Sequence, residues 1–438
     1  MSEAAGRFFE SLVQPIPRPY TERAQIAQRR VRDLLDRLGN PQRTLPCIHV
    51  AGSKGKGSTA LFAQAILRQL GHKTGTFLSP HLHAWNERFM LSGAPVSDDR
   101  LNQAINVLRQ PVAELTRLHP DAPPSFFDAL TACAFELFDD AGVEFAIIET
   151  GLGGRFDATT VANAQVSCIS SIEYEHTDKL GETLAEIAGH KAGIIKPGVP
   201  VIVGPMHHSA AEVIAEEARS LGAPLVRFGV EFQAQTSSTE APTRLRFVEG
   251  SFKLDLKLRT PGALAVTNAA LAVQCVRQLL GPEVDHRAKD FSRALESVVL
   301  PGRTEIMCQT PLVIVDAAHT AASAKGLTTL LKSLAAEQVH LLVSMTAGKQ
   351  INVVLEELVP YCQQVTVTLA EPSRSIDPEK LARTIRKLAP NKSVRVEPNV
   401  RLAVESAYKA IPSGGSLCVA GSVYLAGSAR AVLQELLD

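Results

Sequence analysis

Short runs of apolar, β-branched residues alternate with longer segments of helical periodicity along almost the whole chain. In the first two thirds, the runs that predict strands cover residues 46–51, 74–78, 144–149, 166–172 and 199–203. Helical patterns cover residues 58–70, 99–117 and 127–140. Strands that alternate with helices in this way are typical of a parallel α/β sheet.

The last third repeats this rhythm after a Pro-Gly turn in the segment 297–307, "SVVLPGRTEIM". Its strand candidates are 312–316, 339–344, 364–369 and 416–420, and its helix candidates are 321–335, 351–361, 378–388, 400–411 and 427–437. We therefore predict an α/β protein of two domains, residues 1–297 and 298–438. Residues 225–258 alternate with period two, which predicts a small antiparallel sheet added to the first domain.

Composition narrows the class of protein. The 438 residues include 45 basic and 45 acidic side chains, so nothing favours a nucleic-acid or membrane-surface partner. The seven cysteines are widely spaced without a C-x-x-C pair, which favours reduced thiols in the cytoplasm. The first residues lack the apolar core of a signal peptide. Polar residues interrupt the most apolar stretch, 264–280, which argues against a membrane span.

The segment "HVAGSKGKGSTALFAQAIL", residues 49–67, follows a predicted strand and opens a predicted helix. This is the strand–loop–helix context of a phosphate-binding loop, in which backbone N–H groups and the helix N-terminus face an anion. Lys56 would reach the phosphates of ATP, and Ser58 or Thr59 could face Mg²⁺. The spacing differs from G-x-x-x-x-G-K-[ST] because Gly57 separates the lysine from the hydroxyls. A glycine-rich turn without a ligand is the alternative.

Other candidates follow predicted strands. Glu149 ends an apolar strand, where open parallel sheets bind ligands, and a carboxylate near a triphosphate suits Mg²⁺. His176 lies beyond the next predicted strand, so it can converge with Glu149 on a metal, although a lone histidine is more often structural. Lys191 lies in "GHKAGIIKPG", where it could simply favour a helix C-terminus.

The joint pattern resembles the Mur ligase superfamily, and in particular the folylpolyglutamate synthase and dihydrofolate synthase family. The resemblance rests on "HVAGSKGKGST" and, in family order, on "FLSPHLHAWNERFMLSGAPVS", "SFFDALTACAF", "ETGLGGRFDATT", "HTDKLGETLAEIAGHKAGIIKPGVPVI", "PGRTE" and "DAAHTAAS". It covers most of both predicted domains. It implies a P-loop ATPase-like first domain and a Rossmann-like second domain that carries the glutamate-ligase part.

The resemblance implies roles for single residues. It places nucleotide contacts at Gly52, Ser53, Gly55, Lys56, Gly57, Ser58, Thr59, Asn268, Arg303 and Asp316. It assigns metal contacts to Ser79, Glu149 and His176, with two Mg²⁺ ions. It implies catalytic roles for Lys56, His176, Lys191, Arg303 and His319, with Lys191 carbamylated by CO₂. It places pterin contacts at Pro80, His81, Arg88, Phe126, Phe127 and Asp157.

The implied reaction is ATP-dependent ligation of L-glutamate to a pterin or folate carboxylate through an acyl phosphate, in a cytoplasmic monomer whose partners are small molecules. Closure of the two domains would assemble the site and exclude water. Several positions depart from the commonest bacterial pattern: Glu175, Asp128, His190, Leu264 and Ala265. Two alternatives remain: a Mur-type amino-acid ligase for a non-folate acid, and a non-catalytic nucleotide-binding relative.

Overall fold

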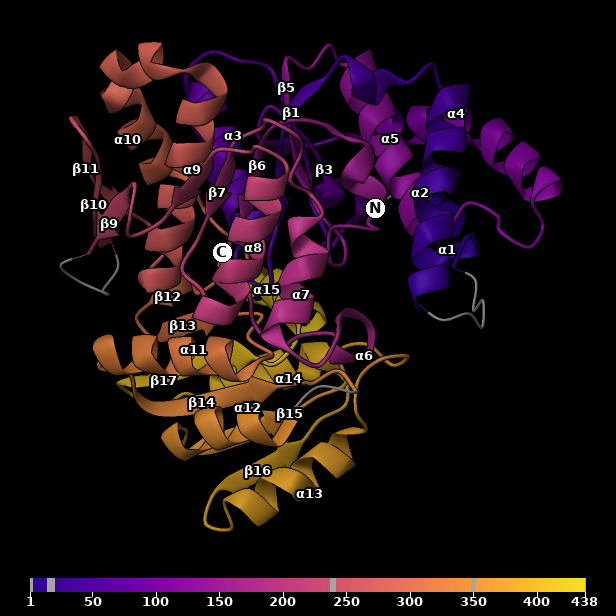
Figure 1. The fold of residues 1–438 in the computed structure, drawn as a ribbon. Helices are drawn as coiled ribbons and strands as arrows, with labels where there is room; N and C mark the ends of the chain where they lie inside the picture. Colours follow the sequence, from indigo (N-terminus) through magenta and orange to yellow (C-terminus); the bar gives the residue numbers. More distant parts are fainter. Residues whose placement is uncertain (1–2, 14–19, 237–241, 348–350, 438) are drawn as a thin grey trace. The chain divides into compact units, whose positions relative to one another are not determined.

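The computed structural model describes residues 3–13, 20–236, 242–347 and 351–437. The chain forms two compact units (Figure 1). The first contains residues 1–235, 245–257 and 265–298, and the second contains 236–244, 258–264 and 299–438. Each unit is built around its own sheet and is described separately.

The first unit contains an eight-stranded sheet in the order β4-β3-β2-β5-β1-β6-β7-β8. Its strands are β1 (Pro46–Ala51), β2 (Thr74–Phe77), β3 (Phe89–Leu91), β4 (Ala94–Pro95), β5 (Phe145–Glu149), β6 (Asn163–Ile169), β7 (Val201–Val203) and β8 (Leu225–Arg227). The pairs β2–β5, β5–β1, β1–β6, β6–β7 and β7–β8 are parallel, and the pairs β2–β3 and β3–β4 are antiparallel. The carboxyl ends of β2, β5, β1 and β6 therefore share one edge, where polar loops can meet.

Helices connect these strands and cover the sheet. They are α1 (Glu3–Ser11), α2 (Tyr20–Arg37), α3 (Lys56–Gln69), α4 (Asp98–Leu118), α5 (Phe126–Asp140), α6 (Thr177–Leu180), α7 (Leu184–Ala192), α8 (His208–Ser220), α9 (Ala263–Leu280) and α10 (Ala288–Ser297). Short 3₁₀ turns are η1 (Pro41–Arg43), η2 (Trp85–Arg88), η3 (Ala158–Val161) and η4 (Pro282–Arg287). Helices α1, α2, α4 and α5 pack in one core, and α7 and α8 pack in another. The strand residues of both cores, such as Ile148 and Ile169, lie on the same face of the sheet, because they are in register with His49 and Ala51, two residues apart on β1.

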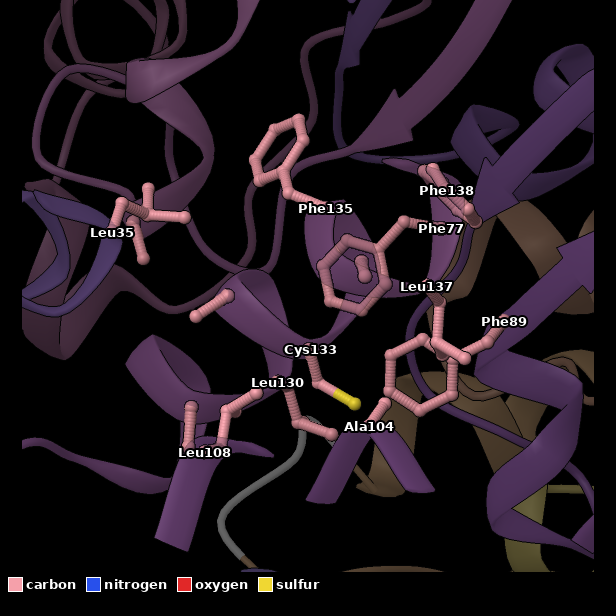
Figure 2. Packing of buried hydrophobic residues seen from close by; sticks show 14 of the residues in the cluster. Leu35, Phe77, Phe89, Ala104, Leu108, Leu130, Cys133, Phe135, Leu137 and Phe138 are labelled. Atoms are coloured by element: carbon pink, nitrogen blue, oxygen red, sulfur yellow. The ribbon is translucent and has the colours of Figure 1, made fainter. Parts of the chain in front are cut away.

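The larger of these cores is rich in aromatic rings. Figure 2 shows Phe77 and Phe89 beside Leu137, and the two rings stack with centroids 5.7 Å apart. Phe138 lies over Gly75, where an added Cβ would meet the ring at 2.6 Å. Only glycine leaves room for the Phe138 ring at this position, so α5 can pack closely against β2.

The period-two segment confirms the predicted antiparallel addition only in part. Strands β9 (Gln233–Gln235), β10 (Thr243–Glu249) and β11 (Phe252–Leu258) form a three-stranded sheet. Its outer residues alternate with buried ones along β11. Residues 225–227, however, are β8, the parallel edge strand of the main sheet. The sequence could not separate the two cases, because polar and apolar residues alternate in the same way along an edge strand and along a hairpin strand.

The second unit contains a six-stranded sheet in the order β12-β13-β17-β14-β15-β16. Its strands are β12 (Glu305–Gln309), β13 (Leu312–Val315), β14 (Glu337–Val343), β15 (Gln364–Val367), β16 (Ser393–Val396) and β17 (Gly415–Ala420). Its helices are α11 (Ala321–Ser333), α12 (Ile351–Leu358), η5 (Val359–Tyr361), α13 (Pro378–Leu388), α14 (Val400–Lys409) and α15 (Val423–Leu437). All pairs are parallel except β12 with β13, which matches the predicted α/β class.

Two sequence expectations, on a membrane span and on thiols, can be compared with the fold. By length and composition α9 could cross a membrane, but 61% of its apolar window is buried inside the protein, as in a core helix. All seven cysteines carry free thiols, and Cys308 alone is partly exposed. The six others are buried, as apolar strand and helix positions would place them.

Candidate active site

The loop between β1 and α3 is shaped by glycines that leave room for neighbouring groups. At Gly52, φ is 146°, and an added Cβ would lie 2.0 Å from Ser170 Oγ. At Gly55, φ is 84°, and an added Cβ would lie 2.2 Å from Asn268 Oδ1. Both conformations strain any residue with a side chain. The predicted Asn268 therefore lies directly against the loop, brought there by α9.

Gly57, the unusual third glycine, faces the predicted metal ligand. An added Cβ would lie 3.3 Å from Glu149 Oε2, which is closer than most Cβ contacts. Glu149 is 4% exposed, and its Oε2 accepts a hydrogen bond from the Ser79 backbone N–H at 2.9 Å. The shifted loop spacing thus places a bare backbone where the carboxylate of β5 approaches α3.

The first turn of α3 carries the candidate hydroxyls. Ser58 is 8% exposed, whereas Thr59 is fully buried. The Thr59 Oγ1 has no hydrogen-bond partner among the described residues. Its backbone N–H donates to Gly55 O at 2.8 Å, so Thr59 belongs to the regular turn of the helix. Ser58 is the better placed of the two hydroxyls to meet a ligand.

Polar residues at the end of β6 hold the loop from the opposite side. The Ser53 N–H donates to Ser171 O at 2.8 Å, and Ser171 Oγ accepts from the Lys54 N–H at 2.9 Å. Ser170 Oγ donates to Lys54 O at 2.5 Å. The sequence reasoning missed these serines. Their signal was the pair of hydroxyls at the end of a strand adjacent to β1.

Two lysines converge on one carbonyl of the loop. Lys56 Nζ donates to Gly52 O at 2.8 Å, and Lys191 Nζ, carried by α7, donates to the same oxygen at 3.0 Å. Lys191 also donates to Glu175 Oε1 at 2.8 Å, with side chains 2% and 12% exposed. The structure thus brings Lys191 into the loop, with Glu175 as a partner that the sequence flagged only as a departure from the family pattern.

Burial and neighbouring charges act in opposite directions on the pKa values of Lys191 and Glu175. Burial, then Lys56, lowers the pKa of Lys191 to about 8 although Glu175 raises it. Burial alone would raise the pKa of Glu175, but Lys191 and Lys56 outweigh it and the pKa falls to about 2. At neutral pH both groups are charged. His176 precedes α6 at φ 47° and is exposed, close in sequence to Glu175.

The predicted pterin residues lie together beside η2. Pro80 follows a cis peptide bond from Ser79. The Arg88 Nε donates to His81 Nδ1 at 2.9 Å, and its guanidinium lies over the rings of Trp85 at 5.2 Å and Phe126 at 5.7 Å. Burial, followed by Arg88, lowers the pKa of His81 to about 3, so its ring is neutral. Trp85, which the sequence reasoning left out, completes this aromatic wall.

Phe127 and Asp157 lie instead at the glycine-rich loop that follows β5. An added Cβ on Gly151 would lie 2.4 Å from Phe127 Cζ, so this ring packs on the glycine loop after Glu149. Asp157 is 6% exposed, and its Oδ2 accepts from the N–H groups of Gly151 and Leu152 at 3.0 and 2.9 Å. Its carboxylate is therefore engaged by backbone.

The second unit carries the remaining predicted residues. Asp316, after β13, accepts from the Thr304 N–H through Oδ2 at 2.6 Å. Arg303 Nη1 donates to Gly302 O at 3.3 Å, and Gly302 O also accepts from the Ala317 N–H at 3.0 Å. The turn that carries Arg303 is thereby fixed to the end of β13.

His319 follows on the same strand end. Its Nδ1 lies 2.7 Å from Ala317 O, and its backbone N–H donates to Ser323 Oγ at 3.2 Å. The structure thus brings Arg303, Asp316 and His319 together at one edge of the second sheet. No cluster of three or more histidine, cysteine, aspartate or glutamate side chains suited to a metal occurs in the described part of the chain.

A parallel sheet with a phosphate-type loop, followed by a second parallel α/β unit, defines an ATP-dependent ligase of the Mur type. Residues 302–423 match the family model described as "Mur ligase, glutamate ligase domain". The chain is 32% identical over 433 residues to the dihydrofolate synthase/folylpolyglutamate synthase of Mycobacterium tuberculosis, covering 92% of this chain and 88% of that one. It therefore belongs to the dihydrofolate synthase/folylpolyglutamate synthase family.

Solved structures agree with this assignment. The M. tuberculosis folylpolyglutamate synthase complexed with ADP has a TM-score of 0.90 and 31% identity, with 99% of both chains covered. The E. coli FolC in complex with DHPP and ADP has a TM-score of 0.82 and 25% identity, covering 97% of this chain and 100% of that one. The comparisons support the family of ATP-dependent glutamate ligases and neither of the two alternatives.

Proposed function

We propose that the chain joins L-glutamate to the carboxylate of dihydropteroate or a reduced folate, using ATP. The observation that carries this is the convergence of Lys56 and Lys191 on Gly52 O, with Glu149 beside Gly57. This arrangement places the positive charge of Lys56 and a glycine-rich backbone where a triphosphate would bind. The γ-phosphoryl group would pass to the substrate carboxylate, and the amine of glutamate would then displace phosphate.

The described residues fit Mg²⁺ at the strand edge. Glu149 supplies a buried carboxylate that accepts a hydrogen bond from the Ser79 backbone N–H, and the Ser58 hydroxyl lies in the adjacent helix turn. Oxygen ligands of this kind suit a hard divalent cation. When bound, Mg²⁺ would neutralise charge on the phosphates. We propose Ser79, Glu149 and His176 as its protein ligands.

We propose further roles that follow the same assignment. Residues 1–297 would bind ATP, through the loop and Asn268, and residues 298–438 would form the glutamate-ligase part. Arg303 would stabilise the transferring phosphoryl group, with Asp316 and His319 as further nucleotide contacts. The aromatic wall at Trp85 and Phe126, with His81 and Arg88, would take the flat pterin ring. We expect a cytoplasmic monomer, which gel filtration would test.

Carbamylation of Lys191 is a separate proposal. The neutral amine attacks CO₂ and releases one proton, which is favoured because the pKa of Lys191 is lowered to about 8. The product would be an anion beside Glu175, so Mg²⁺ should promote it. A carbamate signal in ¹³C NMR with labelled bicarbonate, present in the wild type and absent in Lys191→Met, would support this. Equal spectra for the two proteins would contradict it.

The test of function is ADP release with ATP, Mg²⁺ and L-glutamate, offering dihydropteroate or tetrahydrofolate in separate reactions. Mass spectrometry of the products then identifies the acceptor. A glutamate adduct on dihydropteroate alone indicates a dihydrofolate synthase; on tetrahydrofolate alone, a polyglutamate synthase; on both, a bifunctional enzyme. Lys56→Met is the inactive control. No adduct with either acceptor would refute the proposed folate activity.

A further inference from the structure

His49 is a buried polar residue that the proposed chemistry does not use. It lies in the middle of β1, is fully buried, and pairs with Ile148 of β5, directly beside the pairing of Val50 with Glu149. Burial, followed by the charge of Lys196, lowers the pKa of His49 to about 3, so its imidazole is neutral. Burying a polar imidazole costs free energy of desolvation that an apolar side chain in the same position would not cost. The hydrogen bonds of His49 must therefore offset this cost.

The hydrogen bonds of His49 form a chain with a fixed direction. Its Nε2 lies 2.8 Å from Thr159 Oγ1, which in turn lies 2.5 Å from Asp157 Oδ1. An ionised carboxylate only accepts, so the threonine hydroxyl donates to Asp157 and accepts from His49. The proton of the imidazole is therefore on Nε2. The other ring nitrogen, Nδ1, is buried without a partner among the described residues, as a lone pair.

Asp157 passes this restraint to the backbone next to Glu149. Its Oδ1 also accepts from the Thr159 N–H at 3.0 Å, while Oδ2 holds the N–H groups of Gly151 and Leu152. Burial raises the pKa of Asp157, and the Thr159 hydroxyl is the largest of the donors that oppose this rise, so losing that hydroxyl removes one of the groups that hold the carboxylate in place. The backbone of residues 150–152 is thus tied to β1 by side chains.

We propose that His49 is a positioning residue for Glu149, acting through Thr159 and Asp157 on the loop that follows β5. This rests on the proposed Mg²⁺ role of Glu149. Groups that orient a metal ligand are worth about 10- to 100-fold in metal affinity when they are removed. The chain ends on Asp157, itself one of the predicted pterin contacts, so the test separates metal-dependent binding of the nucleotide from binding that needs no metal.

The test uses Thr159→Val, which removes the hydroxyl and keeps the shape, with Thr159→Ser as the matched control that keeps the hydroxyl. Hydrogen exchange of peptides covering residues 150–157 measures the restraint without any ligand. Titration with a fluorescent ATP analogue, with Mg²⁺ and with EDTA, measures binding at equilibrium. We expect faster exchange and roughly tenfold weaker Mg²⁺-dependent binding in Thr159→Val, unchanged binding in EDTA, and values near wild type in Thr159→Ser.

Other outcomes overturn the proposal. Equal behaviour of the valine and serine variants would show that the hydroxyl relay does not matter, and equal losses in EDTA would show general damage. If Thr159→Val does not fold, His49→Gln, which keeps a donor, is compared with His49→Leu in the same assays. The binding assays need no turnover. An inactive wild type would therefore refute the proposed folate activity, while the role of the His49–Thr159–Asp157 hydrogen bonds could still be tested.

Discussion

Substituting Glu175→Gln tests the reading of the buried charge pair. The change keeps the size of the side chain and removes the negative charge from Lys191, which lies 2.8 Å away and is 2% exposed. Breaking a buried ion pair by removing one partner costs about 3–5 kcal/mol. Lys191 keeps its bond to Gly52 O, and Glu175 is 12% exposed, so we expect a loss of about 3 kcal/mol, at the lower end of that range.

The loss should depend on pH with a defined sign. The folded-state pKa of Lys191 is lowered from 10.5 to about 8, so between these values the unfolded state binds more protons and stability gained from this group rises with pH. Without Glu175, which raises that pKa, the window extends to lower pH. The difference in unfolding free energy between wild type and variant should therefore be largest below neutral pH and shrink as the pH rises to about 8.

The assay is urea unfolding followed by tryptophan fluorescence. Trp85 is the single tryptophan of the chain and lies in the first unit, so the signal reports on the unit that carries the pair. The double variant Glu175→Gln with Lys191→Met is the control, because removing both charges should recover most of the loss. A difference of less than about 0.5 kcal/mol below neutral pH, or one that stays unchanged as the pH rises to about 8, would refute the interpretation.

Three further predictions concern the loop and the core. Gly55→Ala should weaken nucleotide binding by more than about tenfold, since φ is 84° and the added Cβ meets Asn268. The control Gly71→Ala, at φ 101° with nothing within 4 Å of the added Cβ, should leave nucleotide binding unchanged. Isothermal titration calorimetry compares the two variants, and equal effects on binding would contradict the role of the contact. Lys56→Met should abolish ADP release with little change in Tm, and a large Tm loss would mean a structural lysine. Phe138→Ala should cost about 3–5 kcal/mol in urea unfolding, and less than about 1 would contradict a tightly packed ring.

Much of the secondary structure could be predicted from the sequence. The strand at 46–51 and the helix after it were predicted from apolar runs and periodicity, and the structure has them as β1 and α3. Strand β12 was missed because Glu305–Gln309 is short and half-buried, so no run of buried residues marks it. Strand β8 was assigned to the wrong sheet because alternation does not say which neighbour a strand pairs with.

The sequence by itself determined the class of fold, the family and the identity of the loop, because these depend on the order of residues along the chain. Only the tertiary structure decided which groups meet: that Gly57 leaves room for Glu149, that Lys191 pairs with Glu175, and that His49 reaches Asp157 through Thr159. These contacts join residues far apart in sequence, since parallel strands bring their carboxyl ends to one edge whatever the chain length between them.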